Sequence, residues 1–155
     1  MRIQLHVLKL TCRNSEELVP FSDNVTFFHG TLSTGKSSIA RLVDFCLGGD
    51  LEQTTALRRE LVSAQLSLAI GEHAVLLERN RDENQVRATW EDAQGNSTTA
   101  LVRAKGDGPP ILGSEVVNIS DLILYLLGRS IIRVRKRTGA DDSPMVRLSF
   151  RDLFK

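Results

Sequence analysis

This sequence has few of the residues that build metal centres, disulfide frameworks or membrane spans. Its two cysteines, Cys12 and Cys46, lie in distant segments, and its three histidines are scattered. Their spacing is typical neither of a metal site nor of a disulfide framework. No hydrophobic run approaches the length that crosses a bilayer, and the N-terminal residues lack the apolar stretch of a signal peptide. We therefore expect a cytoplasmic protein with reduced thiols and no membrane partner.

The sequence also lacks an excess of charge of either sign. Twenty Lys and Arg residues against nineteen Asp and Glu residues give a net charge of +1. Any contact with nucleic acid must therefore come from a local basic patch rather than from the overall field. With 155 residues, 41 % of them hydrophobic, the chain has the size and composition of one globular domain.

The most informative motif lies at residues 30–37, which read Gly-Thr-Leu-Ser-Thr-Gly-Lys-Ser. This is a complete G-x-x-x-x-G-K-[ST] pattern, the Walker A or phosphate-binding loop. Before it, residues 25–28 (Val-Thr-Phe-Phe) favour a buried strand, and after it apolar residues recur at helical spacing from Ile39 to Cys46. A strand, a glycine loop and a helix in this order predict that backbone N–H groups and the helix N-terminus bind phosphate.

We expect the ligand to be ATP with Mg²⁺. Lys36 would reach the β- and γ-phosphates, and the Ser37 hydroxyl would bind the metal ion. The predicted phosphate-binding residues are Gly30, Thr31, Leu32, Ser33, Thr34, Gly35, Lys36, Ser37 and Ser38. The sequence supplies no evident base to activate water, so we assign no catalytic residue.

Strand patterns surround this unit. Residues 2–10 alternate as a first strand whose apolar face switches near Leu8, which predicts either a bulge or the strand's end. Residues 61–104 favour an antiparallel meander with hairpin turns. A helix capped by Ser120 is expected over 120–128, and a basic strand over 131–137. We therefore predict an α/β fold in which the strand, phosphate loop and helix carry an inserted antiparallel meander.

The order of elements resembles the N-terminal lobe of ABC-type ATPase heads. The residues that carry the resemblance are the start Met1–Leu5, the block Phe27–Ile39 and the helix end Val43–Gly48. Within that superfamily the chain is most similar to the SMC/RecN-like ATPases of DNA repair, chromosome maintenance and anti-phage defence. The resemblance implies that residues 1–155 are the ATP-binding half of a head whose ATP-driven dimerisation controls DNA engagement.

The same resemblance implies partners. We did not find the glutamine loop, the signature segment or the Walker B acids of such heads in these residues. We therefore expect a C-terminal half of the head, on missing sequence or on another chain, and a homodimer on ATP binding. A nuclease or effector subunit is a further expected partner. ATP hydrolysis is then expected only from the completed, dimerised head.

Two groups of arginines are candidates for contact with nucleotide or DNA. Arg58 and Arg59 follow the phosphate-loop helix, where related heads often carry an arginine, although a solvated position on a loop explains them equally. Arg133, Arg135 and Arg137 would share one face of the basic strand. That face could contact phosphates, or it could be the polar side of an edge strand that keeps itself soluble.

Two other functions use the same loop. A small-molecule or nucleotide kinase would need a lid with arginines and a parallel sheet continued by further βαβ units. A nucleotide-sensing interaction module would bind ATP without turning it over. The meander after the first helix argues against the kinase.

Overall fold

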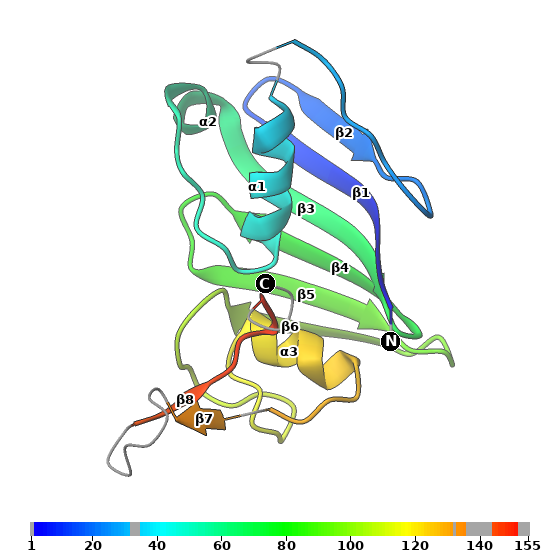
Figure 1. The fold of residues 1–155 in the computed structure, drawn as a ribbon, viewed down its shortest axis with the longest axis vertical. Coiled ribbons are helices and arrows are strands. Elements are labelled where there is room, and N and C mark those ends of the chain that lie inside the picture. The colour runs from blue at the N-terminus through cyan, green and yellow to red at the C-terminus, as the bar shows by residue number, and fades with distance from the viewer. Residues whose placement is uncertain (1, 32–34, 132, 136–143, 152–155) are drawn as a thin grey trace.

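The structure is a computed structural model, and it describes residues 2–31, 35–131, 133–135 and 144–151. Its main element is a six-stranded sheet with the strand order β2-β1-β3-β4-β5-β6 (Figure 1). The strands are β1 Ile3–Cys12, β2 Glu16–Pro20, β3 Leu61–Ile70, β4 His73–Asn80, β5 Gln85–Glu91 and β6 Ser97–Arg103. Every pair of neighbouring strands in this sheet is antiparallel.

Alternation of apolar and polar residues explains why one face of the sheet is buried. In β3, Leu66, Leu68 and Ile70 are buried while the residues between them are half-exposed. Because successive side chains of a strand point to opposite faces, this period of two gives one core face and one open face. The meander predicted over 61–104 is therefore confirmed, with hairpin connections between β3 and β6.

A register shift between Leu5 and Val7 explains the switch of face in the first strand. Leu5 pairs with Leu68 and Leu8 pairs with Leu66, so one extra residue of β1 lies between these two pairs. Such a bulge keeps apolar residues on the core face both before and after it. The bulge is thus the correct one of the two predicted explanations.

Three helices complete the core with the sheet. They are α1 Lys36–Cys46, α2 Thr55–Glu60 and α3 Ile119–Leu126. Helix α1 lies across one face of the sheet and buries Leu42, Phe45 and Cys46, whereas α3 lies beside β6 (Figure 1). Asn118, not the predicted Ser120, caps α3, because its side chain accepts a hydrogen bond from the Asp121 N–H.

A small hairpin of β7 Arg133–Arg135 and β8 Met145–Arg147 stands at the lower end of the molecule (Figure 1). In the parts of the chain that the structure describes, no helix is long and apolar enough to cross a membrane.

The predicted α/β fold is wrong. The meander is not inserted into a mixed unit, because β1 and β2 join it in one antiparallel sheet, and the described helices are few. Residues 25–28 form no strand, and Val25 and Phe27 are 60 % and 84 % exposed rather than buried. Their β-branched and aromatic side chains favour a strand locally, but a strand forms only where a neighbour supplies hydrogen bonds, and no described strand pairs with them.

Candidate phosphate-binding site

The predicted phosphate loop joins the sheet edge to α1. The chain leaves β2, runs back beside it and enters α1 at the upper end of the molecule (Figure 1). Gly35 is the N-cap of α1 and has a φ of 81°, in the left-handed region. A residue with a Cβ atom costs about 1–2 kcal/mol more there. The second glycine of the motif is therefore needed where the loop turns into the helix.

Lys36 closes the loop on itself. Its Nζ atom donates hydrogen bonds to the carbonyl oxygens of Gly30 and Thr31, each at 2.8 Å. These contacts hold the ammonium group against the first two residues of the motif instead of extending it into solvent. A positive charge is thus placed at the loop before any ligand arrives.

The N-terminal end of α1 is electrostatically suited to an anion. Its first turn carries no acidic residue, and in the part of the chain that is described no side-chain cap closes it. The N–H groups of Ser38 and Ile39 both donate hydrogen bonds to the carbonyl oxygen of Gly35. The partial positive charge of a helix N-terminus and the charge of Lys36 therefore add at one exposed place.

The expected magnesium ion has one candidate protein ligand here, Ser37. Among the described residues, no group of three or more His, Cys, Asp or Glu side chains could hold a metal ion. Mg²⁺ seldom needs such a cage, because it commonly takes one or two protein ligands together with phosphate oxygens and water. Ser37 lies exposed in the first turn of α1, where its hydroxyl is accessible for that role.

The structure separates the predicted arginines into two places. Arg58 and Arg59 are exposed in the last turn of α2, at the same end of the molecule as the loop (Figure 1). Arg133 and Arg135 lie in β7 at the opposite end. The two groups therefore cannot serve one nucleotide together. Leu32, Ser33, Thr34 and Arg137 lie outside the described residues.

The β7–β8 hairpin has acidic neighbours. Arg133 pairs directly with Arg147 across the strands. Arg147 forms an ion pair with the buried carboxylate of Asp121 at 2.8 Å, and Arg133 lies 3.7 Å from the carboxylate of Glu115. Opposing like charges on paired strands are thereby partly offset.

Sequence reasoning missed Arg79, which holds the C-terminal end of α1. Arg79 is only 7 % exposed, and its Nη1 atom donates to the carbonyl oxygens of Phe45 (2.8 Å) and Gly49 (2.7 Å). Its guanidinium carbon lies 4.0 Å from the centre of the Phe45 ring, within range of a cation–π contact. We call Arg79, Phe45 and Gly49 the α1 clamp. The signal in the sequence is positional: Arg79 continues the core-facing series Val75, Leu77 of β4.

Burial changes the titration of two groups at this end. It lowers the pKa of Arg79, although a guanidinium remains charged at neutral pH. It also raises the pKa of the Cys46 thiol to about 12, while the nearby Arg79 charge acts in the opposite direction. Cys46 is therefore a neutral core residue, as small buried thiols usually are.

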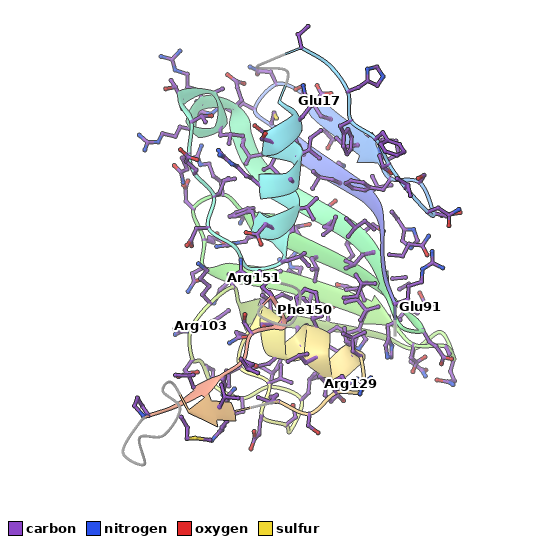
Figure 2. The ribbon with its side chains drawn as sticks, viewed as in Figure 1. Glu17, Glu91, Arg103, Arg129, Phe150 and Arg151 are labelled. Carbon is purple, nitrogen blue, oxygen red and sulfur yellow. The ribbon has the colours of Figure 1, made fainter. Side chains whose placement is uncertain are left out.

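A second arginine reaches the same helix end from the C-terminal region. Arg151 forms hydrogen bonds of 3.0 and 3.2 Å to the carboxylate of Asp44, and Phe150 packs into the core beside it. Figure 2 shows Phe150 and Arg151 between the C-terminal end of α1 and α3. The two ends of α1 thus differ sharply in the contacts that they make.

The chain matches no known protein-family model, no curated protein and no solved structure. No relative therefore assigns a role to any residue of the loop.

Proposed function

We propose that this chain binds ATP with Mg²⁺ through residues 30–38. The observation that carries the proposal is the loop itself: a complete G-x-x-x-x-G-K-S segment caps α1, and Lys36 is held against its first residues. Backbone N–H groups would bind the phosphate oxygens, and Lys36 would act as a point charge on the β- and γ-phosphates. Bound Mg²⁺ would neutralise phosphate charge, with Ser37 as its protein ligand.

The proposed context of this site is an SMC/RecN-like ATPase of DNA repair, chromosome maintenance or anti-phage defence in the cytoplasm. The chain would supply the phosphate cradle, and the C-terminal half of the head would supply the groups that activate water. ATP-driven homodimerisation would then control engagement with DNA or with a nuclease or effector subunit. Phosphoryl transfer depends mainly on positioning and charge stabilisation, so dividing these parts between segments is chemically reasonable.

Exposed apolar residues beside the loop support the expectation of a protein partner. Leu18 in β2 is 65 % exposed, and Val25 and Phe27 are more than half exposed between β2 and the loop. Contiguous exposed apolar surface often marks a site of protein interaction. The three residues lie in β2 and in the segment that joins β2 to the loop.

A kinase is the less favoured use of the same loop. It would continue the phosphate-loop unit with further βαβ units and a parallel sheet. All neighbouring strands of the sheet described here pair antiparallel instead.

Calorimetry on the full-length protein with a slowly hydrolysed ATP analogue and Mg²⁺ tests the proposal. Lys36→Ala should weaken binding by about tenfold or more, because charge-assisted phosphate contacts are the strong ones. Lys105→Ala is the matched control, since Lys105 pairs with Asp50 away from the loop. Light scattering of the same variants should show nucleotide-dependent dimers only where Lys36 is intact. Equal affinity of wild type and Lys36→Ala would overturn the assignment of the site.

A further inference from the structure

Arg79 is a costly residue to bury where it lies. It and Asp121 are the two buried charged or polar residues among those described, but Asp121 has Arg147 as an ion-pair partner. Arg79 donates hydrogen bonds to three backbone carbonyl oxygens, those of Phe45, Gly49 and Glu83. A buried charge without a directly bonded counter-charge carries a desolvation cost of several kcal/mol. Filling space in the core does not by itself explain why a charged side chain is buried at this position.

The electrostatics of α1 supply part of that reason. Its last turn contains no basic residue, so the partial negative charge of its C-terminal carbonyl groups is not met from within the helix. Arg79 reaches across from β4 and binds carbonyl oxygens at that end. The helix is thus fixed to the sheet by a cation at one end, while its other end is open to an anion.

The residues just after the C-terminal end of α1 are closely packed. A Cβ atom added at Gly48 would lie 2.5 Å from the Ala104 carbonyl oxygen and 2.5 Å from Cγ2 of Ile119. A Cβ atom added at Gly49 would overlap the Asp44 carboxylate. At the N-terminal end, a Cβ atom on Gly35 would meet none of the described atoms within 4 Å. Among the described residues, the contacts that fix the direction of α1 are therefore concentrated at its C-terminal end.

We propose that Arg79 is a positioning residue for the phosphate loop. The eleven residues of α1 form a rod about 16 Å long. A tilt of only about 4° at the clamp would therefore move the N-terminus by about 1 Å. A displacement of that size in a reacting site can cost about a hundredfold in rate, and hydrogen bonds to phosphate likewise depend on distance and angle. This inference rests on the proposed nucleotide site and adds the residue that aligns it.

The test compares the buried Arg79 with Arg147, a partly buried arginine that also contacts a helix. Arg79→Met and Arg147→Met each remove a guanidinium that binds buried acceptors, but Arg147 reaches Asp121 of α3 rather than α1. Both variants should unfold at lower temperature than wild type. Binding of the ATP analogue with Mg²⁺ is measured well below either unfolding temperature. We expect Arg79→Met to bind about tenfold or more weakly and Arg147→Met to bind as wild type does.

A purely structural role for Arg79 predicts a different result. Both variants would then lower the unfolding temperature while affinity in the folded state stayed unchanged, and the proposal would be overturned. Equal weakening by both variants would also overturn it, since the effect would not be specific to the clamp. If Arg79→Met does not fold, Arg79→Lys replaces it. A lysine keeps the charge but lacks the planar fork that spans Phe45 and Gly49, so several-fold weaker binding is expected.

Failure of this inference is distinguishable from failure of the proposed function. Loss of affinity in Lys36→Ala with unchanged affinity in Arg79→Met would remove only the positioning role. Absence of binding by the wild-type protein would remove the nucleotide site and the positioning role together.

Discussion

The two ends of α1 are opposite in nearly every physical respect. At the C-terminal end, Phe45 and Cys46 are buried, and Arg79 and Arg151 bind the carbonyl and carboxylate groups there. At the N-terminal end, Gly35 and Ser37 are exposed, and no acidic residue stands in the first turn. The C-terminal end is therefore fixed by contacts with the rest of the protein, whereas the N-terminal end is exposed and is the end at which we propose that phosphate binds.

This contrast shows how one short helix can combine stability with binding. The contribution of α1 to the free energy of folding comes mainly from the apolar contacts and buried hydrogen bonds of its C-terminal end. The residues that we propose to bind phosphate lie at the other, exposed end. Substitutions at the two ends should therefore separate stability from nucleotide affinity.

Gly48→Ala should show the largest effect on stability. Gly48 has a φ of 95°, and the added methyl group would press on the backbone of Ala104. Left-handed strain and overpacking together should lower the free energy of unfolding by about 3–5 kcal/mol. Urea unfolding followed by circular dichroism measures the loss. A loss below about 1 kcal/mol would show that the fixed end is looser than its contacts indicate.

Gly35→Ala makes the same change at the open end. Here the added methyl group meets no atom of the described residues within 4 Å, so the backbone strain of φ 81° is the main cost. We expect the unfolding free energy to fall by about 1–2 kcal/mol, clearly less than for Gly48→Ala. Affinity for the ATP analogue should nevertheless drop about tenfold or more, since a shifted backbone moves the N–H groups that bind phosphate. Calorimetry and urea unfolding on the same preparation give both numbers.

Cys46 should produce the smallest effect at neutral pH, where its thiol is protonated in both states, and a slope of stability with pH only above pH 9. Its pKa is about 12 in the folded protein against 9.0 for an unperturbed thiol. Above pH 9 the unfolded chain therefore loses this proton first, and stability falls as the pH rises toward 12. The slope from this group approaches about 1.4 kcal/mol per pH unit. Cys46→Ala should remove that part of the slope, and an unchanged slope would show that the thiol is not held neutral by burial.

Local pattern was enough to predict the elements around the site. Helix α1 and the meander both depend on spacing within a few residues, and each lies where the sequence predicts it. The pairing of strands was not predictable in the same way. Residues 25–28 have the side chains of a strand but no described strand beside them, so their strand character is not realised.

Charged residues in core positions were the other source of error. Alternation within β4 places Arg79 on the core face of the sheet. Its charge favours a position on the protein surface instead, because charged side chains are almost never buried without a partner. Its acceptors, the carbonyls of Phe45 and Gly49, lie about thirty residues away in the chain. Every residue has a backbone carbonyl group, so the sequence does not show which carbonyl oxygens Arg79 binds. The α1 clamp is therefore recognised only from the structure.

The number of residues between Leu5 and Leu8 in β1 determines which side chains of that strand face the core. Ile3 and Leu5 lie on one side of the irregularity and Leu8 and Leu10 on the other, yet all four face inward. Omitting His6 would leave that inward set in strict alternation, and so would one further residue, because Leu5 and Leu8 would then be separated by an even number of positions. The odd spacing between Leu5 and Leu8, more than the identity of the residue at position 6, is what makes the bulge necessary.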